Sequence, residues 1–261
     1  MQLLWYRRPR KLLVFINPYG GKKKAPDIYK KVYPLFRLAS IQLDERVTQR
    51  ANHARDLLLD MDLSGYDGVV GVGGDGMFSE LLNGLVVRAQ QDAGVNMDNP
   101  YAPLSPPSLS LGVVPAGSTD ALACSVTGVN DPVSSALIII MGESSSLSPD
   151  IILHWQFVIL HLICYCHKPT DWPLVIFSPD WLLWHVISHL IGHFHICYCG
   201  GPGQRVKVDV TSIHHNGKLI RYNSSFLGYG YFGDLMAESE KFRWMGPKRY
   251  DWSGKDVIMM H

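Results

Sequence analysis

The sequence predicts an α/β protein, in which a parallel sheet over residues 12–147 is followed by an incomplete β-rich domain over 208–261. Two observations predict this fold class. Short apolar runs alternate with segments of helical periodicity as far as Met141, as they do in parallel sheets whose strands are connected by helices. From Val206 onward, apolar residues alternate with polar ones, which is typical of strands with one solvated face.

The parallel sheet is expected to contain buried strands, because several short apolar runs end in turn-forming residues. These runs are residues 12–16, 41–47, 67–72 and 109–114. Segments with helical spacing separate or follow them, at 27–38, 51–61, 78–87, 121–126 and 132–141. Residues 90–108 have little periodicity and several prolines, so a loop is expected there.

Single residues predict two details of the helices. Pro34 is expected to end the first helix early, since proline lacks an N–H and its ring clashes with the preceding turn. Thr48 stands where an N-cap residue would stand before the second helix. In the β-rich part, residues 206–211 and 219–227 are strand-like.

Composition and charge exclude several classes of protein. Hydrophobic residues make up 47% of the chain and charged ones 18%, so a core can form and wholesale disorder is excluded. The formal net charge is +1, and a balance this flat argues against a nucleic-acid partner. No feature of the sequence identifies a protein partner.

Cysteine usage and the N-terminal segment indicate a compartment. Four of the five cysteines form two Cys-x-Cys pairs, which is not the framework of a secreted disulfide-rich domain. Residues 1–11 form a basic segment whose charged residues follow the apolar ones, the reverse of a secretory signal. We therefore expect a cytoplasmic protein, and the basic cluster at 7–11 is compatible with peripheral attachment to a membrane.

Glycine-rich turns follow three of the predicted strands, at the strand ends where such sheets bind ligands. They are Asn17-Pro18-Tyr19-Gly20-Gly21, Gly73-Gly74-Asp75-Gly76 and Gly117-Ser118-Thr119-Asp120. Glycines let backbone N–H groups approach a phosphate, and the three lysines after Gly21 add cations. None of the turns is a Walker sequence, and all three are expected to converge on one edge of the sheet.

Asp75 is the candidate catalytic residue within these turns. A carboxylate is unsuited to direct contact with a phosphate, because like charges repel. It suits a metal-associated group, or a general base for an attacking hydroxyl. The structural alternative is a tight strand-to-helix turn with a capping aspartate.

Taken together, NPYGGK, VGGDGMFSELLNGL and PAGSTDALA resemble the superfamily of diacylglycerol, sphingosine and ceramide lipid kinases. Within it, LGYGYFGD, SEKFRWMG and RYDWSG are similar to the ceramide kinases, so that the resemblance covers nearly all of 12–147 and 208–256. It implies ATP, Mg²⁺ bridging the nucleotide phosphates, and phosphorylation of the primary hydroxyl of ceramide to ceramide 1-phosphate. A sphingosine or diacylglycerol kinase, or a non-catalytic lipid- or nucleotide-binding remnant, are the alternatives.

The resemblance also implies roles for residues that match the family's motifs. Asp75 would be the general base or would orient the lipid hydroxyl. The positions that match the nucleotide site are Asn17, Pro18, Gly20, Gly21, Thr48, Gly73, Gly74, Gly76, Glu80, Gly117 and Ser118. Arg243 and Arg249 match arginines that bind the phosphates, a role that suits guanidinium groups, and the alternative for both is a solvated face.

Two further residues concern the lipid. Sphingosine kinases hold the substrate ammonium with an acidic residue two positions after the one that matches Asp234, and this position is Met236 here. Because the amide of ceramide is neutral, the resemblance favours ceramide as substrate. Asp234 would order the site or cap a turn. A membrane lipid as substrate also implies peripheral membrane association.

The resemblance implies parts of a kinase that this chain does not include. Ceramide kinases carry an N-terminal pleckstrin-homology domain, and most of the C-terminal β-rich domain is expected after His261. That domain would supply part of the lipid pocket and one wall of the nucleotide cleft.

His214 and His215 are two adjacent histidines, a residue type that often binds metal ions. Adjacent residues on a strand point to opposite faces, so the two imidazoles are not expected to bind one ion. A strand end followed by a turn is the expected structure, and no metal ligand is assigned.

The resemblance breaks at residues 148–207, an apolar insertion rich in Cys, His and Trp. Residues 151–204 contain only three charged side chains, Lys168, Asp171 and Asp180. Ser-Pro-Asp at 148–150 recurs at 178–180, and Ile-Cys-Tyr-Cys at 163–166 recurs at 196–199.

Three interpretations of the insertion remain open. Its thiols and imidazoles could bind zinc, although Cys-x-Cys is tighter than the usual spacing. Its uncharged runs could enter a membrane, although one is short and the other contains several His and Gly residues. We favour translated non-coding sequence, because the odd composition, the repeat and the clean break occur together, and we then assign it no function.

Overall fold

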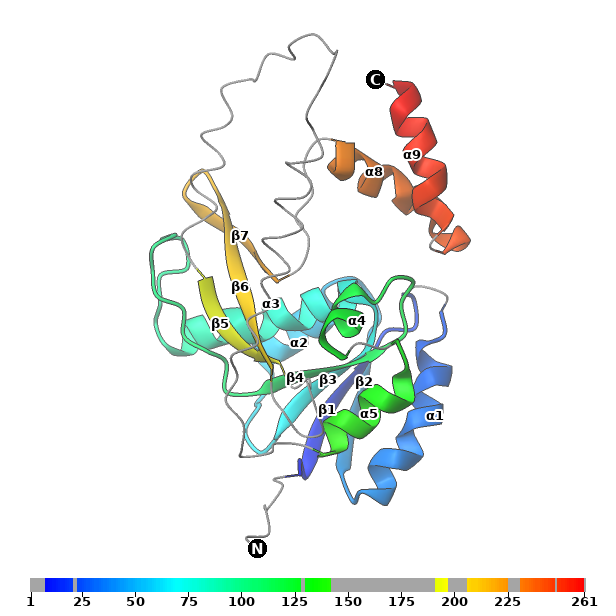
Figure 1. Cartoon of the computed structure of the whole chain (residues 1–261). Helices are drawn as coiled ribbons and strands as arrows, with labels where there is room; N and C mark the ends of the chain where they lie inside the picture. Colours follow the sequence, from blue (N-terminus) through cyan, green and yellow to red (C-terminus); the bar gives the residue numbers. More distant parts are fainter. Residues whose placement is uncertain are drawn as a thin grey trace, which may run out of the picture.

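The computed structural model describes residues 8–20, 23–127, 130–141, 191–196, 206–224, 231–246 and 248–260. Within them, one sheet has the strand order β2-β1-β3-β4-β5-β6-β7 (Figure 1). The parallel strands are β1 (Lys11–Ile16), β2 (Gln42–Val47), β3 (Gly68–Gly73) and β4 (Ser110–Pro115). The antiparallel strands are β5 (Ile191–Ile196), β6 (Val206–His215) and β7 (Lys218–Asn223). A parallel sheet continued by antiparallel strands confirms the predicted fold class.

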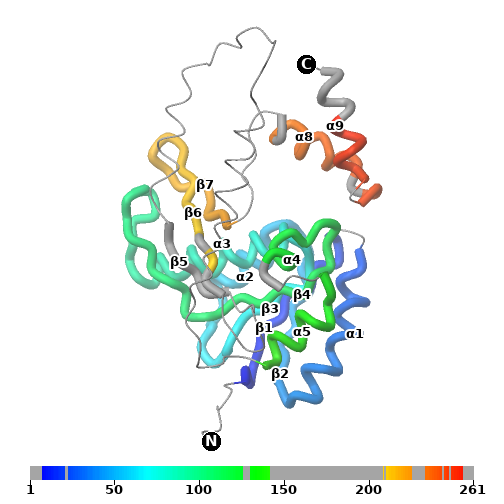
Figure 2. Tube along the Cα trace, viewed as in Figure 1, coloured from blue at the N-terminus to red at the C-terminus, as the bar shows by residue number. Residues whose placement is uncertain are grey.

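Helices cover both faces of the parallel strands (Figures 1 and 2). α1 and α5 pack against each other on one face, and α2 and α3 pack against each other on the opposite face. Their bounds, with that of α4, are α1 (Ala25–Leu38), α2 (His53–Asp60), α3 (Asp75–Asp92), α4 (Ala121–Thr127) and α5 (Pro132–Met141). The C-terminal part contains α8 (Tyr231–Ser239), the 3₁₀ helix η2 (Glu240–Met245) and α9 (Lys248–Met260).

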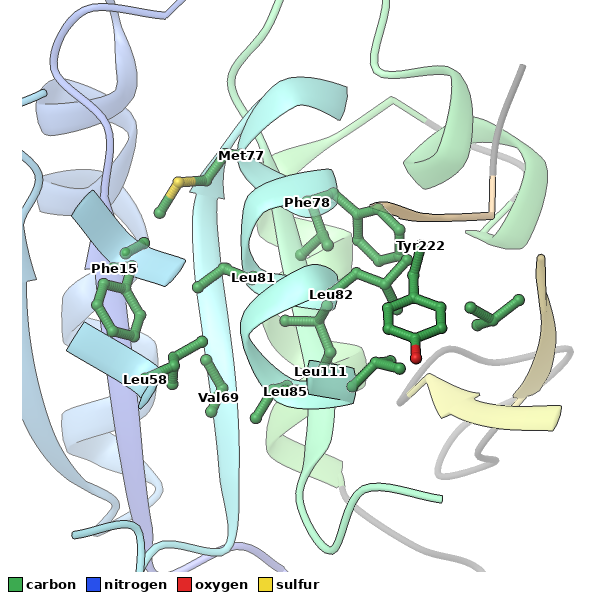
Figure 3. Close-up of a cluster of buried hydrophobic side chains, with 14 of the residues drawn as sticks. Phe15, Leu58, Val69, Met77, Phe78, Leu81, Leu82, Leu85, Leu111 and Tyr222 are labelled. Atoms are coloured by element: carbon green, nitrogen blue, oxygen red, sulfur yellow. The ribbon is translucent and has the colours of Figure 1, made fainter. Parts of the chain in front are cut away.

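Strand β1 shows why the parallel strands are continuous apolar runs. Leu13 and Phe15 are buried in the core with α2 and α3, whereas Leu12, Val14 and Ile16 are buried with α1 and α5. Side chains alternate along a strand, so a strand covered on both faces needs apolar residues at every position. Figure 3 shows the α3 side of this core.

Two predictions about the helices are wrong. Pro34 does not end α1, which continues to Leu38. Pro34 lies on the exposed face of the helix, where water can bond the carbonyl that its missing N–H leaves unpaired. Thr48 is not the N-cap of α2, because that position belongs to Asn52, which has φ 60°.

A hairpin of β6 and β7 docks on α3. It turns at Asn216 and Gly217, which have φ 49° and 70°, as two-residue hairpin turns require. The side chain of Asn83 joins the hairpin to α3: its Nδ2 donates to Tyr222 O at 2.8 Å, and Oδ1 accepts from Tyr222 N at 2.8 Å. Tyr222 is 1% exposed and extends the α3 core onto β7 (Figure 3).

The described residues after β7 are helical, which the sequence does not predict. α8 packs against η2 and α9, and α9 packs against η2. His214, by contrast, lies at the predicted strand end, and its Nε2 is 2.9 Å from Met97 O. The imidazole of His214 therefore contacts the backbone at Met97. In the part of the chain that the structure describes, no helix is long and apolar enough to cross a membrane.

Residues 191–196 of the predicted insertion form β5. This strand pairs with β6 along its length and with β4 through the single pair Leu111 and Ile196. The insertion's expected end at 207 falls inside β6. Residues 148–190 and 197–205, to which the zinc, membrane and non-coding interpretations mainly apply, lie outside the described part of the chain. Residues 1–7 of the basic segment also lie outside it.

Candidate functional site

The three glycine-rich turns meet at one edge of the sheet. The order β2-β1-β3-β4 creates a switch point between β1 and β3, because the chain leaves these strands in opposite directions. The N–H of Asn17, after β1, donates to Val72 O at 3.1 Å, and that of Ala116, after β4, donates to Gly73 O at 3.0 Å. Ligands of open α/β sheets bind beyond such a point.

The first turn is closed by the side chain of Asn17. Its Oδ1 accepts from the N–H groups of Tyr19 at 3.0 Å and Gly20 at 3.1 Å. Pro18 precedes these two residues in the chain, and α1 begins after them. A Cβ at Gly20 would lie 3.1 Å from Asn17 Nδ2, so this close turn favours glycine. Gly21 lies outside the described residues.

The second and third turns are in backbone contact. A Cβ built on Gly117 would lie 2.6 Å from the Cα of Gly74, and a Cβ built on Gly74 would lie 2.9 Å from the Cα of Gly117. Such distances are shorter than any tolerated contact, and backbone atoms cannot rotate away as a side chain can. Glycine at both positions therefore sets the separation of the two turns.

Substitution of Gly117 by alanine should push these turns apart. We expect the free energy of unfolding to fall by about 1–3 kcal/mol, the usual cost of overpacking, and we would measure it by urea denaturation. Gly76→Ala is the matched control, because a Cβ at Gly76 meets nothing within 4 Å. Equal stability of the two variants would show that the turns are not in the contact described.

Asp75 is the first residue of α3 and lies between the two turns. Its Oδ2 accepts from the N–H of Ala121 at 3.1 Å, and its Oδ1 accepts from the N–H of Leu122 at 3.0 Å, at the start of α4. These bonds fix the plane of the carboxylate. A carboxylate has about four acceptor positions, so two remain for a ligand or a proton.

Asp120 is a site residue to which the sequence gives no role beyond membership of the third turn. It is 4% exposed, and both carboxylate oxygens accept from the N–H of Gly117, at 2.9 and 3.1 Å. Burial, with the nearby charge of Asp75 adding to it, raises the pKa of Asp120 to about 6. The signal that could have found it is a carboxylate in a turn otherwise made of Gly, Ser and Thr.

The side chains of Thr48 and Glu80, two residues that match the nucleotide site, form hydrogen bonds with the backbone of the fold. The Thr48 hydroxyl donates to Ile16 O at 3.3 Å, and Thr48 is 4% exposed. Glu80 Oε1 accepts from the N–H of Ala54 at 2.8 Å, which ties α3 to the start of α2. Both side chains therefore make contacts within the fold, at the end of β1 and between α2 and α3.

A pocket of about 220 Å³ lies beside the third turn. Its walls come from Lys24 and Ile28 at the start of α1, from Asn130 and Pro132 at the start of α5, and from Pro115, Ala116, Gly117 and Asp120. Gly117 and Asp120 both line it, and Ser118, between them, is partly exposed. Lys24 forms no ion pair with the described residues, so its ammonium can bind an anion in this pocket.

The C-terminal helices reach the site through α9. Tyr250 OH is 3.5 Å from Thr119 Oγ1 and accepts from Arg249 Nη2 at 2.6 Å. Arg249 is 8% exposed, and its Nη1 donates to Glu240 at 3.2 Å, so it is not on a solvated face. Arg249 thus lies one residue from a contact with the third turn.

The other C-terminal candidates lie on α8 and η2. Asp234 and Met236 belong to α8, and Met236 is 47% exposed. Arg243 belongs to η2, and its side chain is outside what the structure describes. Among the described elements, α8 packs against η2 and α9.

The family of the chain is established by comparison with known proteins. The model of the diacylglycerol kinase catalytic domain matches residues 11–149, which include all three turns. The chain belongs to this family of lipid kinase domains.

Within it, the chain is ceramide kinase-like. It is 40% identical to human ceramide kinase over 255 residues, covering 97% of this chain and 36% of that protein. It is 32% identical to ceramide kinase 1 of Caenorhabditis elegans over 259 residues, covering 97% and 36%. Sphingosine kinase 2 of Arabidopsis thaliana is 31% identical over 246 residues, covering 94% and 37%. The chain thus spans about a third of the length of these relatives.

Solved structures provide a weaker comparison. A diacylglycerol kinase from Bacillus anthracis matches with a TM-score of 0.39 and 20% identity, over 51% of this chain and 40% of that one.

Proposed function

We propose that this chain carries the catalytic part of an ATP-dependent lipid kinase, which phosphorylates the primary hydroxyl of ceramide to give ceramide 1-phosphate. The observation that supports it most is the position of Asp75. Its carboxylate lies between two glycine-rich turns in backbone contact, at the switch point of a parallel sheet. The similarity to ceramide kinases of several organisms supports the choice of substrate.

The turns are assigned to the phosphates of ATP. Because Gly20, Gly74 and Gly117 carry no Cβ, phosphoryl oxygens can approach the backbone of the turns closely, although the N–H groups of Gly20 and Gly117 donate within the turns. Lys24 and the hydroxyl of Ser118 add a cation and a donor at the pocket beside the third turn. Arg249 is assigned to the phosphates as well, after exchange of its contact with Glu240.

The reaction is a single displacement at phosphorus. The hydroxyl oxygen of ceramide forms a bond to the γ-phosphorus, the bond from that phosphorus to the bridging oxygen breaks, and ADP leaves with the electron pair. Asp75 orients the hydroxyl and accepts its proton through an oxygen position that α4 does not occupy. Positioning and charge stabilisation supply most of the acceleration in such transfers.

Mg²⁺ is assigned to the phosphates of the nucleotide. Among the described residues, no group of three or more His, Cys, Asp or Glu side chains could hold a metal ion. Mg²⁺ usually keeps several waters and is bound by one or two carboxylates together with substrate phosphates, so it does not need such a cluster. When bound, Mg²⁺ neutralises charge on the phosphoryl oxygens.

Ceramide is preferred to sphingosine because of α8. Met236 gives an apolar, half-exposed side chain where sphingosine kinases carry the acidic residue for an ammonium group, and Asp234 is assigned to ordering this end of the site. Because the substrate is a membrane lipid, we assign the protein to the cytoplasmic surface of a membrane as a peripheral protein.

Transfer of radiolabelled phosphate from ATP to ceramide, sphingosine and diacylglycerol, assayed side by side, tests the proposal. We expect product with ceramide and at least about tenfold less with the other two lipids, the factor that corresponds to the net contribution of one hydrogen bond. A variant without residues 148–190, which keeps strand β5, separates the effect of the insertion from that of the site. If another lipid is preferred, that lipid replaces ceramide as the proposed substrate. If neither the original chain nor the shortened variant forms product, the chain is a non-catalytic binding remnant.

A further inference from the structure

Asp120 has a left-handed backbone conformation. Its φ of 50° lies in the left-handed region, which non-glycine residues rarely adopt. The side chain turns back along the chain, and its two oxygens accept from the N–H of Gly117, three residues earlier. At the same time its carbonyl accepts from the N–H of Cys124 at 2.9 Å, which is the first bond of α4. Asp120 therefore fixes both the third turn and the start of the helix.

The next two residues are the ones that hold Asp75. The N–H groups of Ala121 and Leu122 point at its carboxylate because α4 starts at Ala121, directly after the left-handed residue. We propose that Asp120 is a positioning residue of the phosphoryl-transfer site, which clamps the turn at Gly117 and so aims the first N–H groups of α4 at Asp75. This inference deepens the proposed function and rests on it.

The buried charge of Asp120 has a cost in stability. Its buried carboxylate has a pKa raised to about 6, so at neutral pH the fold carries a desolvated charge close to that of Asp75. A raised pKa means that this carboxyl favours the folded state below its unfolded pKa, and that this contribution is lost as the pH rises through about 6. At pH 8 the charge of Asp120 therefore lowers the stability of the fold. The contribution that we propose for Asp120 is to the position of Asp75 and not to stability.

Charged and titratable groups face Asp120 from three elements. Asp75 faces it from α3, Cys124 from α4, and Lys24 lines the same pocket at the start of α1. Protonation of Asp120 replaces an acceptor oxygen by a hydroxyl, so one of the two contacts with Gly117 N–H is lost. The orientation of Asp75 then weakens as the pH falls through about 6.

Asp120→Asn tests the inference, because the amide keeps one oxygen for Gly117 and removes the charge. We expect kcat for ceramide at pH 8 to fall about tenfold, since small misplacements of a reacting group are costly. The midpoint of urea denaturation at pH 8 should stay equal to or rise above that of the original chain. The inflection of kcat near pH 6 should disappear in the variant. Asp131→Asn is the matched control, because the described hydrogen bonds of its carboxylate are with Val133 and Ser134 at the start of α5 and none is with the third turn.

Two results would overturn the inference: unchanged kcat with an unchanged pH profile, or parallel loss of kcat and stability, which would make Asp120 merely structural. A readout that needs no lipid separates this outcome from failure of the proposed function. The amide proton resonances of Gly117, Ala121 and Leu122 should titrate together near pH 6, and Asp120→Asn should abolish the titration. If they do not titrate, the clamp does not exist, whether or not the chain transfers phosphate.

Discussion

Asp75→Asn should lower kcat for phosphate transfer by about 100-fold or more, the usual contribution of a general base. The amide cannot accept the proton of the lipid hydroxyl. It keeps one oxygen for α4, so either Ala121 or Leu122 loses its partner and the remaining bond still orients the group. Steady-state transfer of radiolabelled phosphate measures the effect, and the KM for ATP should change much less than kcat.

Asp92→Asn is the matched control for this substitution. Asp92 is the last residue of the same helix, is 64% exposed, and pairs with Arg88 at 3.0 Å. An exposed pair of this kind contributes little, so activity and stability should stay close to those of the original chain. A loss of activity in Asp75→Asn matched by a loss of ATP binding would show that Asp75 holds the nucleotide and does not act on the lipid hydroxyl.

Asn83→Ala should produce the largest loss of stability among the variants considered. Asn83 is 7% exposed, and the change removes the partners of both the N–H and the C=O of Tyr222, at the point where β7 docks on α3. Each buried polar group left without a partner costs about 1–3 kcal/mol, so we expect a loss of about 2–5 kcal/mol. Urea denaturation, followed by tryptophan fluorescence and by far-UV circular dichroism, measures it.

Asn96→Ala is the corresponding control, since Asn96 is exposed and its side chain accepts only the local N–H of Asp98 among the bonds described. Its stability should change by less than about 0.5 kcal/mol. Asn83→Asp should lie between the two, because it keeps the acceptor for Tyr222 N–H and loses the donor for Tyr222 O. A loss in Asn83→Ala no larger than that in Asn96→Ala would contradict the docking described.

The parallel half of the fold is predictable because burial on both faces makes each strand a continuous apolar run. Gly68–Gly73 ends at the turn that carries Asp75, and Ser110–Pro115 ends at the turn that carries Gly117. Since the carboxyl ends of parallel strands share an edge, the convergence of the turns follows from the strand order alone. Candidate residues on those turns could therefore be chosen before the structure was known.

Contacts between distant segments could not be predicted in this way. Asn83 reaches Tyr222 across 139 positions, and Asp75 reaches Leu122 across 47. Asp120 depends on a left-handed backbone angle, which aspartate adopts more often than most residues but which the sequence alone does not require. Helices α8 and α9 were missed because glycines and aromatic residues around Tyr231 and Tyr250 have low helix propensity.

Helix α3 carries both Asp75, at its first residue, and Asn83, two turns further on, about 12 Å away along the axis. A continuous helix transmits displacement without absorbing it, so the hairpin β6–β7 and the carboxylate of Asp75 move as one body. The helix also fixes the distance between the carboxylate of Asp75 and the hairpin, so a ligand bound against the hairpin would lie at a constant distance from Asp75.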